Sequence, residues 1–107
     1  MNPSYVYRAT VARVVDGDTI RCMMSLGLRT YREESLRVRD VNAPELNTAE
    51  GKAARDWLLV LLPPGRSVVV QTHLDRQTFG RYVADLWVEG RLLADLLVEA
   101  GHAVRVA

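Results

Sequence analysis

Polar and apolar residues alternate in segments of the chain that are predicted to form β-strands. Leu36 and Val38 fall on one face, and Arg37 and Arg39 fall on the other. This expected strand spans 30–41. Earlier segments have the same β-branched and aromatic character, and turn residues separate the strands, so 5–15, 19–24 and 30–41 predict a three-stranded meander.

The periodicity changes after residue 46. Asn47 and Glu50 resemble a capping box, which predicts a helix extending to about residue 62. The Pro-Pro-Gly segment at 63–65 ends this helix. Three residues recur at helical spacing and are expected to face the core: Ala53, Trp57 and Leu61.

Two further strands are expected at 67–72 and 81–88, with Trp87 in the core. A short helix over 93–100 and a weak edge strand over 102–106 follow. Three strands, a helix, two strands and a second helix predict a β-rich α+β fold. The specific expectation is a five-stranded OB-fold Greek-key barrel, with a helix between strands three and four and a short C-terminal helix.

The size and composition are those of one soluble globular domain over residues 1–107. Apolar runs are too short to span a membrane, so no membrane partner is expected. The start of the chain lacks the pattern of a signal peptide, which favours the cytoplasm and leaves secretion from a longer precursor open. Cys22 is the only cysteine, so an internal disulfide is excluded, and we expect a buried, inert thiol.

Charge alone does not indicate a nucleic-acid partner, because the formal net charge is +1. The choice of cation is more informative. Lys52 is the only lysine, and the guanidinium groups of the arginines suit bidentate contacts to phosphate. A codon bias toward arginine is the ordinary explanation for this composition.

The segment that follows the third strand carries several oxygen donors. Hard cations such as Ca²⁺ prefer such ligands, and Asn42, the Ala43 carbonyl and Asp18 can supply three. Glu45 can then hold a water molecule. The alternative is a surface loop in which Glu45 lies near the positive end of the following helix.

Asp16, Gly17 and Asp18 form a strong turn signal, in which Gly17 is free to adopt a positive φ. A plain hairpin turn explains them when they are considered alone. Arg81 follows Phe79-Gly80 at the start of a strand, where it is either an exposed junction residue or a second guanidinium that converges with Arg37 on one phosphate.

Together these groups match the needs of phosphodiester hydrolysis. The reaction requires a water nucleophile, a base and positive charge around the transition state. A metal ion can polarise the phosphoryl oxygen, and positioned cations can contribute ~10³-fold or more in phosphoryl transfer.

Three motifs together resemble the staphylococcal-nuclease (thermonuclease) family. The resemblance covers about Tyr7 to Val106. It rests on Asp16-Gly17-Asp18-Thr19, on Leu36-Arg37 leading into Val41-Asn42-Ala43-Pro44-Glu45, and on Phe79-Gly80-Arg81-Tyr82.

The resemblance implies an OB-fold, Ca²⁺-dependent endonuclease of DNA and RNA with little sequence preference; Mg²⁺ and Mn²⁺ are the alternative metals. It places Asp18, Asn42 and the Ala43 carbonyl on metal-ligand positions. It also implies these catalytic roles: Glu45 as general base, and Arg37 and Arg81 as phosphate-binding residues.

This chain departs from the family pattern in three places. Asn42 replaces an Asp of the family's prototype, which removes one negative charge, and Asp40 is a candidate to compensate. Arg76 is a candidate substitute for a phosphate-binding lysine. The domain is expected to lack the family's final C-terminal helix. Asp16 and Thr19 are expected to support the site or contact the substrate.

The rival interpretation is a non-catalytic OB-fold module that binds nucleic acid or a peptide. The joint presence of Glu45, Arg37 and Arg81 favours the enzyme, because binding alone does not require all three. The sequence leaves the choice between DNA and RNA and the oligomeric state open, including a dimer.

Overall fold

The computed structural model describes residues 5–73 and 82–106. In chain order, the elements are β1 (Val6–Asp16), β2 (Thr19–Ser25), β3 (Tyr31–Val38), β4 (Val41–Asn42), α1 (Ala49–Leu61), β5 (Ser67–His73), β6 (Tyr82–Val88), β7 (Arg91–Leu92), α2 (Leu93–Glu99) and β8 (Val104–Arg105).

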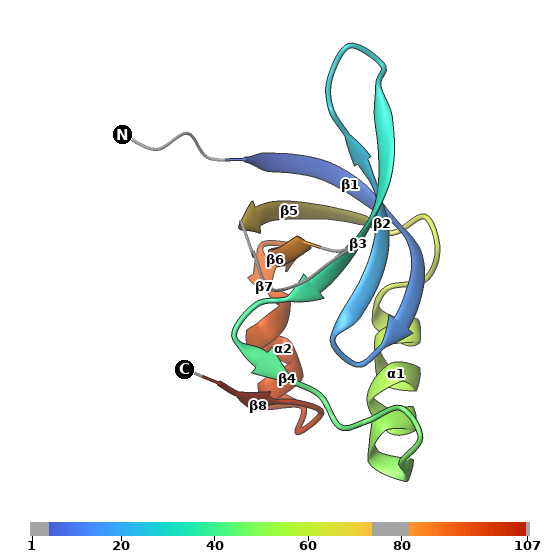
Figure 1. The fold of residues 1–107 in the computed structure, drawn as a ribbon, viewed down its shortest axis with the longest axis vertical. Coiled ribbons are helices and arrows are strands. Elements are labelled where there is room, and N and C mark those ends of the chain that lie inside the picture. Colours follow the sequence, from blue (N-terminus) through green and yellow to red (C-terminus); the bar gives the residue numbers. More distant parts are fainter. Residues whose placement is uncertain (1–4, 74–81, 107) are drawn as a thin grey trace.

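Five long strands close into a barrel. The hydrogen-bonded order is β3-β2-β1-β5-β6-β7, and a parallel pairing between β3 and β6 completes the circle. Helix α1 falls between the third and fourth barrel strands, and α2 follows the fifth, which confirms the predicted OB-fold class. Figure 1 shows α1 beside the turn between β1 and β2, whereas the β2–β3 hairpin extends beyond the barrel at the opposite end.

The expected third strand over 30–41 is divided into two. Asp40 adopts a φ of 65°, which interrupts the strand and turns the chain into β4. Strand β4 then leaves the barrel and pairs with β8, which is the edge strand predicted at the C-terminal end. This division matters because it places Asn42 and the residues after it beneath the end of β3.

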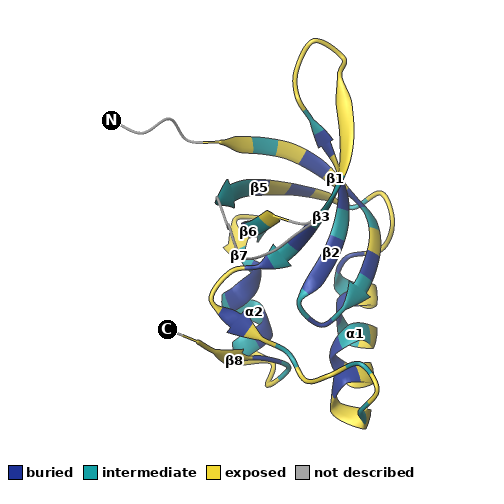
Figure 2. Cartoon of the chain, viewed as in Figure 1, coloured by how far each residue is buried: buried dark blue, intermediate teal, exposed yellow. Residues whose placement is uncertain are grey.

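Inward-facing side chains from all five barrel strands fill the interior, as expected for a small barrel. The two helices close the core with leucines, and Figure 2 shows the buried positions alternating along the strands. The largest fully buried side chains include Ile20, Leu36, Leu58, Leu62, Leu86, Leu93 and Leu97. Cys22 is also buried, and its burial raises the pKa of the thiol to about 12, in agreement with an inert cysteine.

Helix α1 differs from the prediction in its cap and in its buried face. The N-cap is Thr48, not Asn47: Thr48 has an extended backbone, and its Oγ1 accepts a hydrogen bond from the Gly51 amide at 3.0 Å. The buried face contains Ala54 and Leu58, whereas Ala53 is exposed. Trp57 and Leu61 pack against the core from its margin, as partly buried side chains.

Trp87 was expected in the core, and this prediction is wrong. Strand β6 buries Ala84, Leu86 and Val88, so the pleat directs Trp87 to the outer face together with Asp85. Trp87 remains half-buried there. The residues before and after Trp87 therefore face the core, and Trp87 faces away from it.

Candidate active site

Three segments that are distant in sequence meet at one end of the barrel. Asp18 comes from the turn between β1 and β2, Arg37 from the end of β3, and Asn42 and Ala43 from β4 and the residue after it. The Val38 amide donates to the Asp18 carbonyl at 2.8 Å, and the Ala43 amide donates to Asp18 Oδ2 at 3.0 Å. These bonds fix the turn against both segments.

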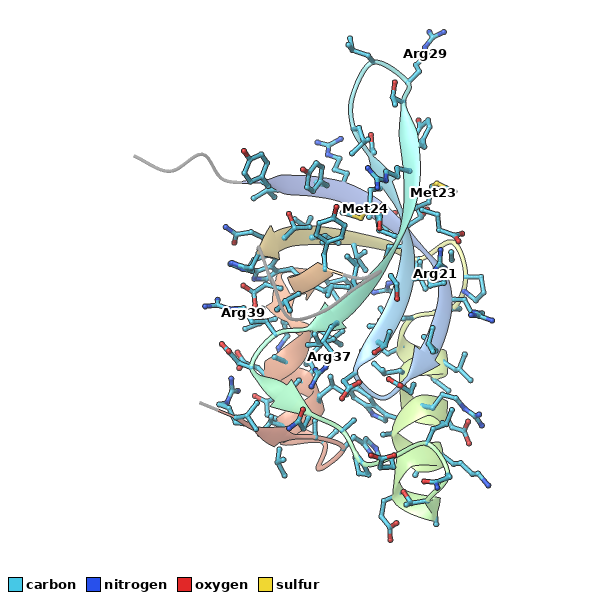
Figure 3. The ribbon with its side chains drawn as sticks, in the orientation of Figure 1. Arg21, Met23, Met24, Arg29, Arg37 and Arg39 are labelled. Atoms are coloured by element: carbon cyan, nitrogen blue, oxygen red, sulfur yellow. The ribbon has the colours of Figure 1, made fainter. Side chains whose placement is uncertain are left out.

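Figure 3 shows Arg37 at the end of β3. Its guanidinium contacts both the carboxylate of Asp18 and the amide of Asn42. Its Nη1 donates to the Val38 carbonyl at 2.7 Å, while its Nη2 donates to Asn42 Oδ1 and lies 3.5 Å from Asp18 Oδ2. The side chains of Arg37 and Asp18 are only 19% and 16% exposed. One guanidinium therefore satisfies two oxygens in a partly desolvated position.

Burial raises the pKa of the Asp18 carboxyl, and the proximity of Asp16 adds to this effect. The hydrogen bond from the Ala43 amide and the charge of Arg37 act in the opposite direction without cancelling the rise. Ionisation of Asp18 therefore lowers the stability of the folded state. Groups with pKa values shifted in this way are common at functional sites.

Gly17 is required at the turn for space. Gly17 does not use the positive φ that glycine permits. A Cβ at this position would lie 2.6 Å from the Cβ of Ala43 and 2.9 Å from the Cβ of Ala54. Only a glycine therefore allows the turn to pack against both the Ala43 segment and α1.

Sequence reasoning missed Gly51 and Thr48, which hold the segment that carries Glu45. A Cβ on Gly51 would lie 1.9 Å from the Glu45 carbonyl oxygen and 2.9 Å from that of Pro44. Thr48 donates to the Glu45 carbonyl through its amide at 3.0 Å and through its Oγ1 at 2.6 Å. The available signal was a glycine in the first turn of a helix, where it lowers helix propensity.

Glu45 itself has a fixed backbone and an exposed side chain. Within the part of the chain that the structure describes, its carboxylate forms no hydrogen bond or ion pair. The carboxylate is thus accessible to solvent, and Glu45 lies two residues after Ala43 in the chain. This arrangement suits a group that acts on water.

The other predicted residues divide into three cases. Thr19 is buried and its Oγ1 donates to Asp18 Oδ1 at 3.3 Å, while Asp16 Oδ1 accepts from the Asp18 amide at 3.1 Å, so both contact Asp18 directly. Asp40 is exposed and pairs with Arg39 at 3.8 Å. Arg76 and the Phe79-Gly80-Arg81 motif lie outside the described residues.

The donor set at this site has the chemistry of a hard-cation site with a low ligand charge. Asp18 Oδ2 and Asn42 Oδ1 face the same cationic nitrogen of Arg37, so the two oxygens already converge on one positive charge. No cluster of three His, Cys, Asp or Glu side chains occurs among residues 5–73 and 82–106. A cation here would therefore depend on one carboxylate, one amide and backbone oxygen.

A cavity of about 220 Å³ adjoins Asn42 and Ala43 and is lined on its other side by residues 101–104. His102 is one of the residues that line this cavity. Its ring lies 5.3 Å from the ring of Trp57, tilted by 42°. The cavity provides room beside the cluster for part of a ligand.

Comparisons with known proteins find similar nucleases. No family model matches the chain. Two curated proteins of rice (Oryza sativa subsp. japonica) are similar to it: probable staphylococcal-like nuclease CAN2, 36% identical over 75 residues, and probable staphylococcal-like nuclease CAN3, 35% identical over 75 residues. Each match covers 70% of this chain, and the chain spans 19% of the length of each relative. No helix within the described segments is long and apolar enough to cross a membrane.

Proposed function

Because this chain belongs to the staphylococcal-nuclease-like family, we propose that it hydrolyses phosphodiester bonds of DNA or RNA in a metal-dependent reaction. The observation that carries the proposal is the convergence of Asp18, Arg37 and Asn42, with the backbone of Glu45 fixed beside them. This combination brings a cation, oxygen ligands and a solvent-accessible carboxylate to one end of the barrel.

Arg37 would bind and neutralise the phosphate. Its Nη1 is anchored on the Val38 carbonyl, so the guanidinium is positioned by the barrel strand rather than by a mobile loop. Its Nη2 would exchange Asn42 for a phosphate oxygen. Arg81, outside the described residues, is proposed as the second phosphate-binding arginine, and charge stabilisation of this type is worth ~10³-fold or more.

Asp18, Asn42 and the Ala43 carbonyl would hold the metal ion, with Ca²⁺ as the first choice and Mg²⁺ or Mn²⁺ as alternatives. When bound, the metal would supply Lewis-acid polarisation of the phosphoryl oxygen. The single carboxylate in this set is expected to give weaker binding than two carboxylates would, because ligand charge tunes the affinity for Ca²⁺.

Glu45 would orient a water molecule and accept its proton. Its exposed carboxylate can reach water, and its main chain is held by Thr48 and by the close approach of Gly51. A fixed backbone matters because a displacement of about 1 Å can cost ~10²-fold in rate.

The proposal is tested by nicking of plasmid DNA, and of a labelled RNA, in the presence of Ca²⁺. Glu45→Gln and Arg37→Ala are each expected to lower the rate by at least ~10²-fold, since they remove the base and a phosphate ligand. Arg13→Ala is the control, because Arg13 is an exposed arginine of β1 outside this cluster. Activity that persists unchanged in the double variant Glu45→Gln and Arg81→Ala would contradict the proposed catalytic roles of these residues. Binding of nucleic acid without cleavage under any divalent ion would favour the non-catalytic module instead.

A further inference from the structure

The outer face of β2, β1, β5 and β6 carries a groove that the proposed active site does not use. Its volume is about 550 Å³. Cross-strand neighbours build its floor, because Arg8 of β1 lies opposite Val69 of β5, and Val69 lies opposite Trp87 of β6. A second row places Met23, Thr10 and Ser67 side by side across β2, β1 and β5.

Large side chains face solvent in this groove. Met23 and Met24 point to opposite sides of β2, so Met24 enters the core while Met23 remains on the outer face (Figure 3). Tyr31, from the β2–β3 hairpin, lines the groove and is 63% exposed. Trp87 of β6 also lines the groove, is half-buried, and is not part of the buried core. Exposed aromatic side chains are common on surfaces that bind a partner.

Two charged side chains line the groove, Arg8 and Glu89. Glu89 pairs with Arg66, whose Nη2 lies 2.9 Å from Glu89 Oε1. Within residues 5–73 and 82–106, Arg8 forms no ion pair. One exposed arginine without a carboxylate partner among the described residues therefore lines the same groove as two aromatic side chains.

We propose that this groove binds a stretch of single-stranded nucleic acid, at a site separate from the active site. Arg8 would contact a phosphate, while Tyr31 and Trp87 would stack on bases, which is how single strands are held without sequence preference. An acidic peptide would use Arg8 but would leave the rings without planar partners. The choice of nucleic acid as the occupant rests on the proposed function.

The groove lies well away from the cluster of Asp18 and Arg37. Thr10 and Asp16 are on the same strand, and at about 3.3 Å per residue they are ~20 Å apart. A long strand can occupy both places, whereas a dinucleotide at the active site cannot reach the groove. The groove would therefore increase the affinity for long substrates without altering the chemistry of cleavage.

The first experiment measures binding of a fluorescently labelled single-stranded oligonucleotide by anisotropy, in chelator so that metal-dependent cleavage is prevented. Arg8→Glu and Tyr31→Ala are each expected to weaken binding about fivefold or more, the lower limit of one lost base stack. Arg13→Glu is the matched control, because Arg13 is an exposed arginine of the same strand that forms no ion pair within the described part of the chain and does not line the groove.

The second experiment compares cleavage of a dinucleotide with cleavage of a long single strand. Arg8→Glu is expected to raise KM for the long strand and to leave the dinucleotide unchanged. Equal losses of binding for Arg8→Glu and Arg13→Glu would overturn the proposal that the groove binds nucleic acid. Wild-type binding by both Arg8→Glu and Tyr31→Ala would overturn it as well. A dimer that dissociates in Tyr31→Ala would overturn it too, in favour of an interface between copies. If the wild type binds through the groove but cleaves nothing, the proposed function fails and the groove stands.

Discussion

Replacing Gly51 by alanine tests whether the Glu45 segment is held by close packing on α1. In an ordinary helix this change increases the stability of the helix by about 1 kcal/mol, because alanine has a higher helix propensity than glycine. Here the new Cβ would lie 1.9 Å from the Glu45 carbonyl oxygen and 2.5 Å from its carbonyl carbon. Both are backbone atoms, so no side-chain rotation relieves the contact. Ordinary van der Waals contact begins at 3.4 Å, so the segment must retreat by about 1.5 Å, which disturbs its hydrogen bonds to Thr48.

The expected effect on stability is therefore opposite in sign to helix propensity. Overpacking against a fixed backbone costs about 1–3 kcal/mol, which exceeds the gain from alanine. Displacement of Glu45 by about 1.5 Å should also lower cleavage by ~10²-fold or more. Urea unfolding followed by tryptophan fluorescence measures the first effect, and plasmid nicking measures the second.

Ala53→Gly calibrates the same helix, since Ala53 is exposed and its replacement should cost only the propensity term of about 1 kcal/mol. Close packing of the Glu45 segment on α1 is refuted if Gly51→Ala unfolds at a higher urea concentration than the wild type and cleaves DNA at the wild-type rate. That result would mean that the segment is free to move away from α1 at no cost.

Four further changes probe separate parts of the structure. Burial raises the pKa of Asp18, so its ionised form lowers the stability of the protein above that raised pKa, and this penalty disappears below the ordinary Asp pKa. Asp18→Asn should therefore raise Tm at neutral pH. In thermal scans at decreasing pH, the difference in Tm from the wild type should shrink. Arg37→Ala should lower cleavage by ~10³-fold yet strengthen Ca²⁺ binding measured by calorimetry, because it removes a competing cation from Asp18 and Asn42. Thr48→Ala should cost about 1 kcal/mol in urea unfolding through loss of the cap, with Thr10→Ala as an exposed threonine control. Leu58→Ala should cost about 2–5 kcal/mol in the same assay, because Leu58 is fully buried in the barrel core.

The barrel could be predicted from the sequence because its strands are strongly patterned. Alternation at Leu36 and Val38, and turn residues between segments, are local signals that tertiary structure did not override. The proximity of Asp18 to the residues after β3 could also be predicted. In an antiparallel meander, the turn between the first two strands and the end of the third strand lie at the same end of the sheet. The motif order then suggested which side chains meet.

The remaining features depend on contacts between distant segments. Asn47 and Thr48 are both good capping residues, and the structure uses Thr48 because its hydroxyl can bridge the Glu45 carbonyl and the Gly51 amide. Gly17 carries a local turn signal, but its real requirement is the approach of Ala43 and Ala54. The outward position of Trp87 depends on the register of β6, and hydrophobicity alone favours the opposite face.

The most direct test of the proposed active site is the Ca²⁺ dependence of DNA cleavage by the wild type and by Asn42→Asp. Asn42→Asp adds a second carboxylate at the oxygen that converges with Asp18 on one cation. The proposed metal site predicts no cleavage in chelator, cleavage that rises with Ca²⁺, and a curve for Asn42→Asp displaced to lower Ca²⁺ concentration. Cleavage that is equal in chelator and in Ca²⁺, or a curve that Asn42→Asp leaves in place, would contradict it.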